Sequence, residues 1–265
     1  MSNRPIGVFD SGLGGLTVLG DLIDIMPHED FIYIGDTANC PYGIHTGAEI
    51  TKLVTKIGDY LIGKGIKALV IACNTATAYS DHLRESTSIP VIGVIDPTVR
   101  AAWDYAKKKR FIVLATDATV DSGLYQKKLT ENDNSALHPV VICVKCGAFV
   151  EAIEAGHIDT DYSHRLIREK LSPYVDEDID TVILGCTHFA FYRREIKKVF
   201  TRANVIDGGR ATGRYLSNIL QSKQMLNPQS GPGRLVLNTT GSAVLFRKQI
   251  EWFKKPYQDI YHIDL

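Results

Sequence analysis

The sequence alternates short, continuously apolar runs with segments that are long enough for amphipathic helices. The runs, rich in Val, Ile and Phe, are residues 5–9, 31–35, 68–72, 90–94, 110–115, 140–144 and 181–185. Runs without polar alternation are typical of parallel strands, because helices cover such strands on both faces. The alternation therefore predicts an α/β fold that is built from βαβ units and parallel sheets.

Two of these runs continue into similar sequences. Residues 68–78 read ALVIACNTATA and residues 180–190 read DTVILGCTHFA, so Cys73 and Cys186 each stand between an apolar run and hydrogen-bonding side chains. The segments VFDSG and VIDGG, which begin at residues 8 and 205, form a second related pair. Such an internal repeat predicts two similar parallel-sheet α/β domains related by pseudo-symmetry.

The repeat places the domain boundaries near Pro97 and Asp207. The first predicted domain contains residues 1–97 and 208–265, and the second contains residues 98–207. In the C-terminal part, Ser, Asn, Pro and Gly mark a loop, which should be followed by a strand and a last helix. These three segments are residues 222–234, 235–240 and about 242–255.

Composition excludes several classes of protein. The 265 residues are 45% hydrophobic, which is enough for real cores, and 30 basic residues balance 30 acidic ones. The longest run of like charge is KKKR at 107–110, which we interpret as a solvated helix end, so we expect neither a nucleic-acid nor a membrane partner. The N-terminus has no signal-peptide pattern, and five cysteines without an export signal indicate reduced thiols and a cytoplasmic protein.

Two thiols at equivalent strand ends suggest a catalytic role, although a single buried cysteine more often serves only as a small apolar side chain. Ligands of α/β proteins bind at the carboxyl ends of parallel strands, where Cys73 and Cys186 stand. Two thiols on opposite faces of one carbon can act as general base and general acid and so invert a stereocentre. One of them must then be a thiolate, and His188 is a candidate for stabilising it, or else a structural histidine.

Two further turns follow predicted strands. FDSGLGGLTVL at 9–19 is a Gly-rich turn before a helix, which could bind an anion or be an ordinary βα turn, and it lacks the spacing of a nucleotide-binding loop. Asp10 in this turn suits a substrate ammonium, or caps a helix. In YIGDTANCPYGIHTG at 33–47, Pro41 and Gly43 fix a turn around Tyr42 that could expose backbone donors or lie on the surface.

Cys143 and Cys146 form a single C-x-x-C pattern, which suits a redox pair or half of a zinc site. A structural zinc ion needs four ligands, and no second pair of this kind occurs in the sequence. We therefore expect no metal, and a dithiol oxidoreductase is the weakest alternative.

The sequence resembles the glutamate racemases, a family within the aspartate/glutamate racemase superfamily. The resemblance rests on IGVFDSGLGGLTVL, GDTANCPYG, ALVIACNTATA, PVIGVI and DTVILGCTH, which recur in the family's order as far as about residue 209. It implies two α/β domains with glutamate bound in the cleft between them, Cys73 and Cys186 as the acid/base pair on the α-carbon, and neither cofactor nor metal. It also implies a homodimer and, in bacteria, a supply of D-glutamate for peptidoglycan synthesis.

The resemblance also implies roles for individual residues. Asp10 and Ser11 would meet the substrate ammonium and assist proton transfer, while Glu154 and His188 would support the thiols. His188 would also contact the substrate. The remaining substrate contacts would come from Pro41, Tyr42 and Gly43 at the side-chain carboxylate and from Asn74, Thr75 and Thr187 at the α-carboxylate.

Three short stretches depart from the family's pattern: KCG at 145–147, THFA at 187–190 and DGG at 207–209. None of them removes a thiol. Two alternatives stay open beside glutamate racemisation. One is a racemase for aspartate or a hydantoin, and the other is a two-lobed amino-acid binding protein without turnover, which would leave the paired cysteines unexplained.

Overall fold

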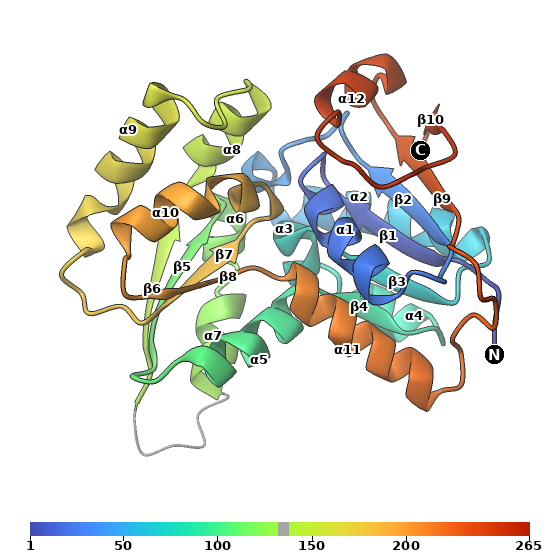
Figure 1. The fold of residues 1–265 in the computed structure, drawn as a ribbon, viewed down its shortest axis with the longest axis horizontal. Coiled ribbons are helices and arrows are strands. Elements are labelled where there is room, and N and C mark those ends of the chain that lie inside the picture. The colour runs from blue at the N-terminus through green and yellow to red at the C-terminus, as the bar shows by residue number, and fades with distance from the viewer. Residues whose placement is uncertain (132–137) are drawn as a thin grey trace. The chain divides into compact units, whose positions relative to one another are not determined.

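The computed structural model describes residues 1–131 and 138–265, and contacts between Cα atoms divide them into two compact units (Figure 1). The first unit contains Met1–Val94 and Gly209–Leu265, and the second contains Ile95–Gly208. Each unit has its own sheet, and every strand pairing within both sheets is parallel. This confirms the predicted α/β class with parallel sheets.

Among the described residues, the sheet of the first unit has six strands in the order β10-β9-β2-β1-β3-β4. Helices cover both of its faces, and α1 packs against α11 (Figure 1). The strands are β1 (Ile6–Asp10), β2 (Phe31–Gly35), β3 (Ala68–Ile71), β4 (Val91–Gly93), β9 (Leu235–Thr239) and β10 (Ile260–His262). The helices are α1 (Gly15–Ile25), the 3-10 helix η1 (Tyr42–Ile44), α2 (Gly47–Gly63), α3 (Asn74–Ala78), α4 (Asp81–Ser86), α11 (Gly209–Ser222) and α12 (Ala243–Gln249).

The described part of the second unit has a four-stranded sheet in the order β6-β5-β7-β8. Helix α5 packs against α7, and α9 packs against α8 and α10. The strands are β5 (Arg110–Ala115), β6 (Val140–Lys145), β7 (Thr181–Gly185) and β8 (Asn204–Ile206). The helices are α5 (Ile95–Tyr105), α6 (Asp117–Asp121), α7 (Leu124–Glu131), α8 (Gly147–Glu154), α9 (Asp161–Leu171), the 3-10 helix η2 (Ser172–Tyr174), the 3-10 helix η3 (Thr187–Tyr192) and α10 (Arg193–Val199).

The two sheets share one topology. The order β2-β1-β3-β4 in the first unit corresponds strand for strand to β6-β5-β7-β8 in the second. Helix α5 follows strand β4 of the first unit yet belongs to the second, and α11 follows strand β8 of the second unit yet belongs to the first. The repeat in the sequence is therefore a repeat of topology, with β3 equivalent to β7.

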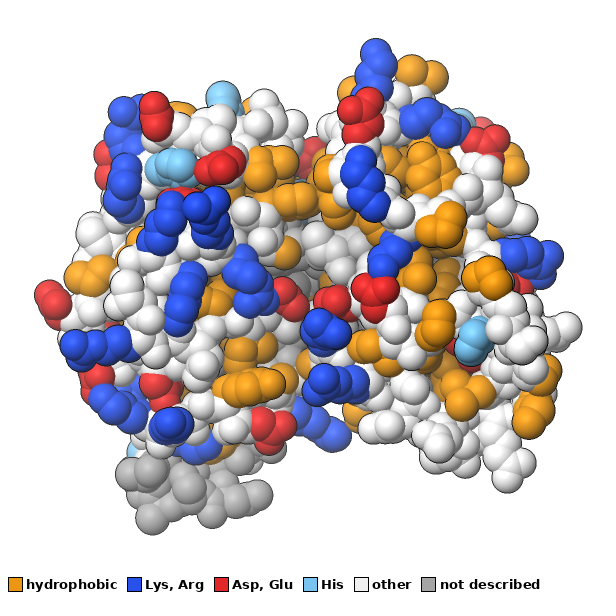
Figure 2. Space-filling view, viewed as in Figure 1, with side chains coloured by type: hydrophobic (Ala, Val, Ile, Leu, Met, Phe, Trp, Pro, Cys, Tyr) orange, Lys and Arg blue, Asp and Glu red, His pale blue; other side chains and the backbone are white. Residues whose placement is uncertain are grey.

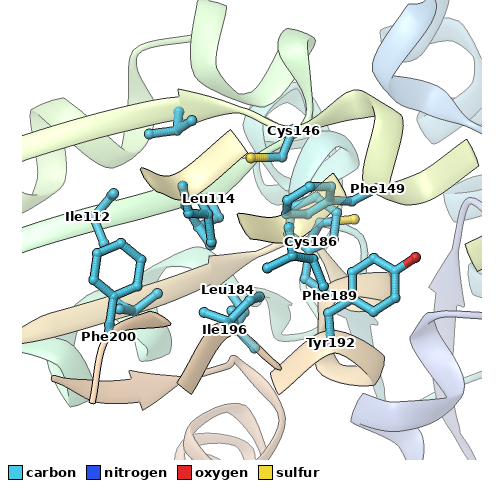
Figure 3. Packing of buried hydrophobic residues seen from close by; sticks show 14 of the residues in the cluster. Ile112, Leu114, Cys146, Phe149, Leu184, Cys186, Phe189, Tyr192, Ile196 and Phe200 are labelled. Carbon is cyan, nitrogen blue, oxygen red and sulfur yellow. The ribbon is translucent and has the colours of Figure 1, made fainter. Parts of the chain in front are cut away.

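The apolar runs form the centres of the sheets because both of their faces are covered. Every residue of β1, β3 and β7 is buried, which explains why these runs lack polar alternation. In the second unit, side chains of β5 and β7 pack with aromatic residues of α8 and η3 (Figure 3). The ring of Phe149 lies edge-on to Phe189 and Tyr192, at centroid distances of 5.4 and 5.6 Å.

The C-terminal part of the chain differs from the sequence prediction. Helix α12 ends at Gln249 instead of continuing to about residue 255, and the following strand β10 was not predicted. Phe253 is buried beside Gly20 of α1, so burial of an aromatic side chain outweighs continuation of the helix. Strand β10 then pairs with β9 and becomes the edge of the sheet.

Some of the charged side chains on the surface form ion pairs. On the face drawn in Figure 2, Lys and Arg side chains gather over α10, where Arg193 pairs with Asp207 and Lys198 with Glu195. The basic run 107–110 begins after α5 has ended at Tyr105: Lys107, Lys108 and Lys109 lie in the turn before β5, Lys109 with a φ of 56°, and Arg110 is the first residue of β5. Among the described residues, no helix is both long enough and apolar enough to cross a bilayer.

Candidate active site

In the first unit, Cys73 stands at the carboxyl end of β3 and caps the short helix α3. Its Sγ accepts a hydrogen bond from the backbone N–H of Ala76 at 3.4 Å and lies 3.6 Å from Oγ of Ser11. The Cys73 side chain is 5% exposed, and the next two residues, Asn74 and Thr75, are also buried. A backbone N–H that donates to a cysteine sulfur at the start of a helix favours the thiolate over the thiol.

Asp10 ends β1 and is fully buried beside this thiol. Its Oδ2 accepts the backbone N–H of Gly12 at 3.0 Å, which shapes the turn into α1. A Cβ at Gly15 would lie 2.3 Å from Cβ of Asp10 and 2.7 Å from the hydroxyl oxygen of Tyr33. A side chain at position 15 would therefore clash, and glycine there lets the start of α1 approach the Asp10 side chain closely.

Tyr42 lies in η1 between Pro41 and Gly43 and is also buried. Its hydroxyl donates a hydrogen bond to Oδ2 of Asp36 at 2.5 Å. Burial raises the pKa of Tyr42 far above its usual range, and the negative charges of Asp36, Cys73 and Asp10 raise it further. The first unit thus brings Asp10, Tyr42 and Cys73 into one neighbourhood.

In the second unit, Cys186 directly follows β7 and precedes η3, which begins with the buried Thr187. Its Sγ lies 3.9 Å from Nδ1 of His188, and Nε2 of the same imidazole lies 2.6 Å from Oε1 of Glu154. His188 is 1% exposed, and Glu154 is the last residue of α8. The three side chains form a row of carboxylate, imidazole and thiol.

Burial and the neighbouring groups have opposite effects on the pKa of His188. Burial alone would lower the pKa of the imidazole, but the hydrogen bonds to Cys186 and Glu154 and the negative charges of both groups raise it to about 10. The carboxylate and the sulfur on either side of His188 therefore favour its protonated, imidazolium form. Packing of Phe149, Phe189 and Tyr192 around Cys186 keeps this row in place (Figure 3).

We expect the imidazole of His188 to titrate with a midpoint near 10, measured by NMR of protein with isotope-labelled histidine. Since this pKa lies above the unfolded value of about 6.5, the contribution to the unfolding free energy is complete below pH 6.5 and is lost as the pH rises through the folded pKa. Glu154→Gln should lower the midpoint, whereas Glu151→Gln, at an exposed position of α8, should not. A midpoint near 6.5 in the unmodified protein would contradict the arrangement.

Thr116 directly follows β5 and was not among the site residues predicted from the sequence. β5 pairs Ala115 with Gly185, and continuing this register by one residue places Thr116 beside Cys186, as β1 places Ser11 beside Cys73. Thr116 is buried, and its Oγ1 lies 2.9 Å from Oγ1 of Thr119. The signal in the sequence was a hydroxyl residue just after each run: Thr116 directly follows the run 110–115, and Ser11 follows the run 5–9 after Asp10.

Cys143 and Cys146 show no feature of a redox couple. Both are free cysteines, Cys143 within β6 and Cys146 before α8. Burial raises the pKa of Cys143 to about 11 and that of Cys146 to about 12, so both remain protonated at neutral pH. This weighs against the dithiol oxidoreductase, which would need at least one reactive thiolate.

The geometry defines a duplicated α/β protein that carries one buried thiol at the equivalent strand end of each unit. Comparison with known proteins agrees: the model of the Asp/Glu/Hydantoin racemase family matches residues 23–216. The chain belongs to that family. A glutamate racemase of Bacillus cereus is 39% identical over 99% of this chain and 98% of that protein.

Solved structures extend the likeness to the whole fold. A glutamate racemase isoform from Bacillus anthracis matches with a TM-score of 0.94 and 37% identity over 100% of this chain and 99% of that one. Glutamate racemase from Francisella tularensis, solved in complex with D-glutamate, matches with a TM-score of 0.91 and 34% identity over 100% and 98% of the two chains. An aspartate racemase from Picrophilus torridus, at 18% identity and a TM-score of 0.58, over 84% of this chain and 95% of that one, shares the fold alone.

Proposed function

We propose that this protein is a glutamate racemase, which interconverts L- and D-glutamate with Cys73 and Cys186 as the two acid/base groups. The observation that carries the proposal is the pair of buried thiols at topologically equivalent strand ends, in a chain similar over its full length to glutamate racemases. The two domains predicted from the sequence would each supply one thiol. In a bacterium the product would serve peptidoglycan synthesis, and the enzyme would act in the cytoplasm as a homodimer.

The reaction needs two proton transfers at one carbon. The thiolate on one face takes the α-proton and becomes a thiol, and the thiol on the opposite face gives its proton to the same carbon and becomes a thiolate. The C–H bond that breaks and the C–H bond that forms lie on opposite faces, so the configuration inverts. The reverse reaction uses the same groups with their protonation states exchanged, and it calls for neither a cofactor nor a metal.

Each thiol has its own support. Sγ of Cys73 accepts a hydrogen bond from the backbone N–H of Ala76 at 3.4 Å and donates one to Oγ of Ser11 at 3.6 Å. Cys186 has the His188 imidazolium, which Glu154 holds by its other nitrogen. His188 would also contact the substrate, and Asp10 with Ser11 would meet the ammonium group.

The two carboxylates of glutamate call for donors at different places. We assign Pro41, Tyr42 and Gly43 to the side-chain carboxylate: Tyr42 and Gly43 have backbone N–H groups that can donate to it, and Pro41, which has none, shapes the turn. Asn74 and Thr75 at the start of α3, together with Thr187 at the start of η3, would hold the α-carboxylate. Hydrogen bonds to a charged carboxylate are stronger than those between neutral groups, so both ends of the substrate would be fixed.

Proton NMR of the reduced protein with L-glutamate in heavy water, with a chiral assay of the product, tests the proposal. We expect the α-proton signal to disappear and D-glutamate to accumulate until the enantiomers are equal, because they have the same free energy in achiral water. Persistence of the signal without D-glutamate would refute glutamate racemisation. Aspartate or a hydantoin in the same assay would then identify a changed substrate, and binding of glutamate without exchange would identify a binding protein.

A further inference from the structure

The turn that follows β9 is bonded to the loop that follows β2. Oγ1 of Thr240 donates a hydrogen bond to Oδ1 of Asp36 at 2.5 Å, and the hydroxyl of Tyr42 donates to Oδ2 of the same carboxylate at 2.5 Å. Asn39 donates its side-chain N–H groups to both oxygens, at 2.9 and 3.1 Å. Asp36 is 1% exposed, so this buried carboxylate connects Thr240 to Tyr42.

A second set of bonds joins the same two segments. The backbone N–H of Ala38 donates to Oγ1 of Thr240 at 3.1 Å, so this hydroxyl accepts from the loop while it donates to Asp36. Oγ1 of Thr37 lies 2.6 Å from Oγ1 of Thr239 and accepts the backbone N–H of Gly241 at 3.1 Å. A Cβ at Gly241 would lie 2.4 Å from Oγ1 of Thr37, so a side chain at position 241 would clash with Thr37 at this distance between the two segments.

We propose that Thr240 is a positioning residue for the substrate side-chain carboxylate, acting through Asp36 on Tyr42. This inference rests on the proposed function, in which Pro41, Tyr42 and Gly43 receive that carboxylate. The phenol of Tyr42 is committed to Asp36, so the loop's contribution to the substrate comes from its backbone N–H groups. The direction of those N–H groups depends on Asp36, and Thr240 holds Asp36 from a part of the chain about 200 residues away.

Replacing Thr240 by valine tests this assignment, because valine keeps the shape and removes the hydroxyl. We expect KM for glutamate to rise by about tenfold, the effect of losing one hydrogen bond to a charged group, with kcat changed by less than about twofold. Thr240→Ser keeps the hydroxyl and should restore a KM near that of the wild type. Thr51→Val is the matched control, since this half-buried threonine on α2 bonds only its own helix, through the carbonyl of Gly47.

Two further measurements separate positioning from general loosening. Hydrogen exchange at the Ala38 amide should become faster in Thr240→Val and stay unchanged in Thr240→Ser and Thr51→Val. In a double-mutant cycle, Tyr42→Phe removes the phenol that Asp36 holds, so adding Thr240→Val should raise KM by less than it does in the wild type. Fully additive effects on KM, or a fall in kcat as large as the fall in kcat/KM, would overturn the assignment.

The outcomes also separate this inference from the proposed function. If the wild type does not turn over glutamate, the proposed function fails. If the wild type racemises glutamate normally and Thr240→Val leaves KM unchanged, only the positioning role of Thr240 fails.

Discussion

Replacing either Cys73 or Cys186 by serine should lower the rate of glutamate racemisation by at least about 1000-fold, because inversion needs an acid or base on each face of the α-carbon. A serine hydroxyl is too weak an acid to exchange a proton at neutral pH, although it fits the space of the thiol. Because serine is close to cysteine in size and shape, we expect the far-ultraviolet circular dichroism of each variant to match that of the wild type, although both cysteines are more than nine-tenths buried. A chiral assay of the product gives the rate.

Cys143→Ser is the matched control for this prediction. Cys143 lies within β6, is partly exposed, and contacts Oε1 of Gln126 at 3.8 Å. We expect this variant to keep the wild-type rate within about twofold, because Cys143 is not one of the residues assigned to support Cys73 or Cys186. Wild-type turnover in either Cys73→Ser or Cys186→Ser would exclude a mechanism with two thiols.

Glu29→Gln should destabilise the protein more than any surface change, because it leaves the ammonium of Lys67 buried without its counter-charge. Nζ of Lys67 lies 2.5 Å from Oε2 of Glu29, and the two side chains are 0% and 3% exposed. The ammonium also donates to the carbonyls of Ser2 and Met225, each at 2.8 Å, and so ties both segments to β3. We expect a loss of about 3–5 kcal/mol in the free energy of unfolding and a fall of about 10 °C in Tm.

Two variants show whether the buried charge is the cause. The double variant Glu29→Gln with Lys67→Met should recover part of the loss, because it removes the uncompensated ammonium. Asp178→Asn breaks a surface ion pair with Lys108, whose side chains are 61% and 57% exposed, and should cost at most about 1 kcal/mol. Urea unfolding of the four proteins measures these differences, and equal losses in the single and double variants would contradict the explanation.

The strands were the most predictable part of the fold. Short apolar runs that alternate with helix-length segments are typical of the buried strands of a parallel sheet, and the runs at 68–72 and 181–185 formed the fully buried strands β3 and β7. The C-terminal part was less predictable, because the end of α12 depends on where Phe253 finds a buried site. Strand β10 carries exposed residues and owes its conformation to pairing with β9.

The candidate site was predictable where motifs are local. Cys73 and Cys186 follow their strands directly, so the sequence placed both thiols at strand ends. Local motifs do not show contacts between residues that are distant in the sequence. The row from Glu154 through His188 to Cys186 joins α8 to η3. The position of Thr116 beside Cys186 follows from the register of β5 and β7.

By itself the sequence determined the parallel-sheet class, the internal repeat and the two thiols, since each depends on residues that are neighbours in the chain. Only the tertiary structure decided how far the supporting side chains lie from one another and from Cys186. The pKa of His188 depends on its burial and on Glu154, 34 residues away, and the Tyr42 loop depends on Thr240, which the chain brings to Asp36 only when β9 joins β2 in the sheet. Electrostatic and hydrogen-bond energies depend on distance in space, and the order of residues along the chain does not fix that distance.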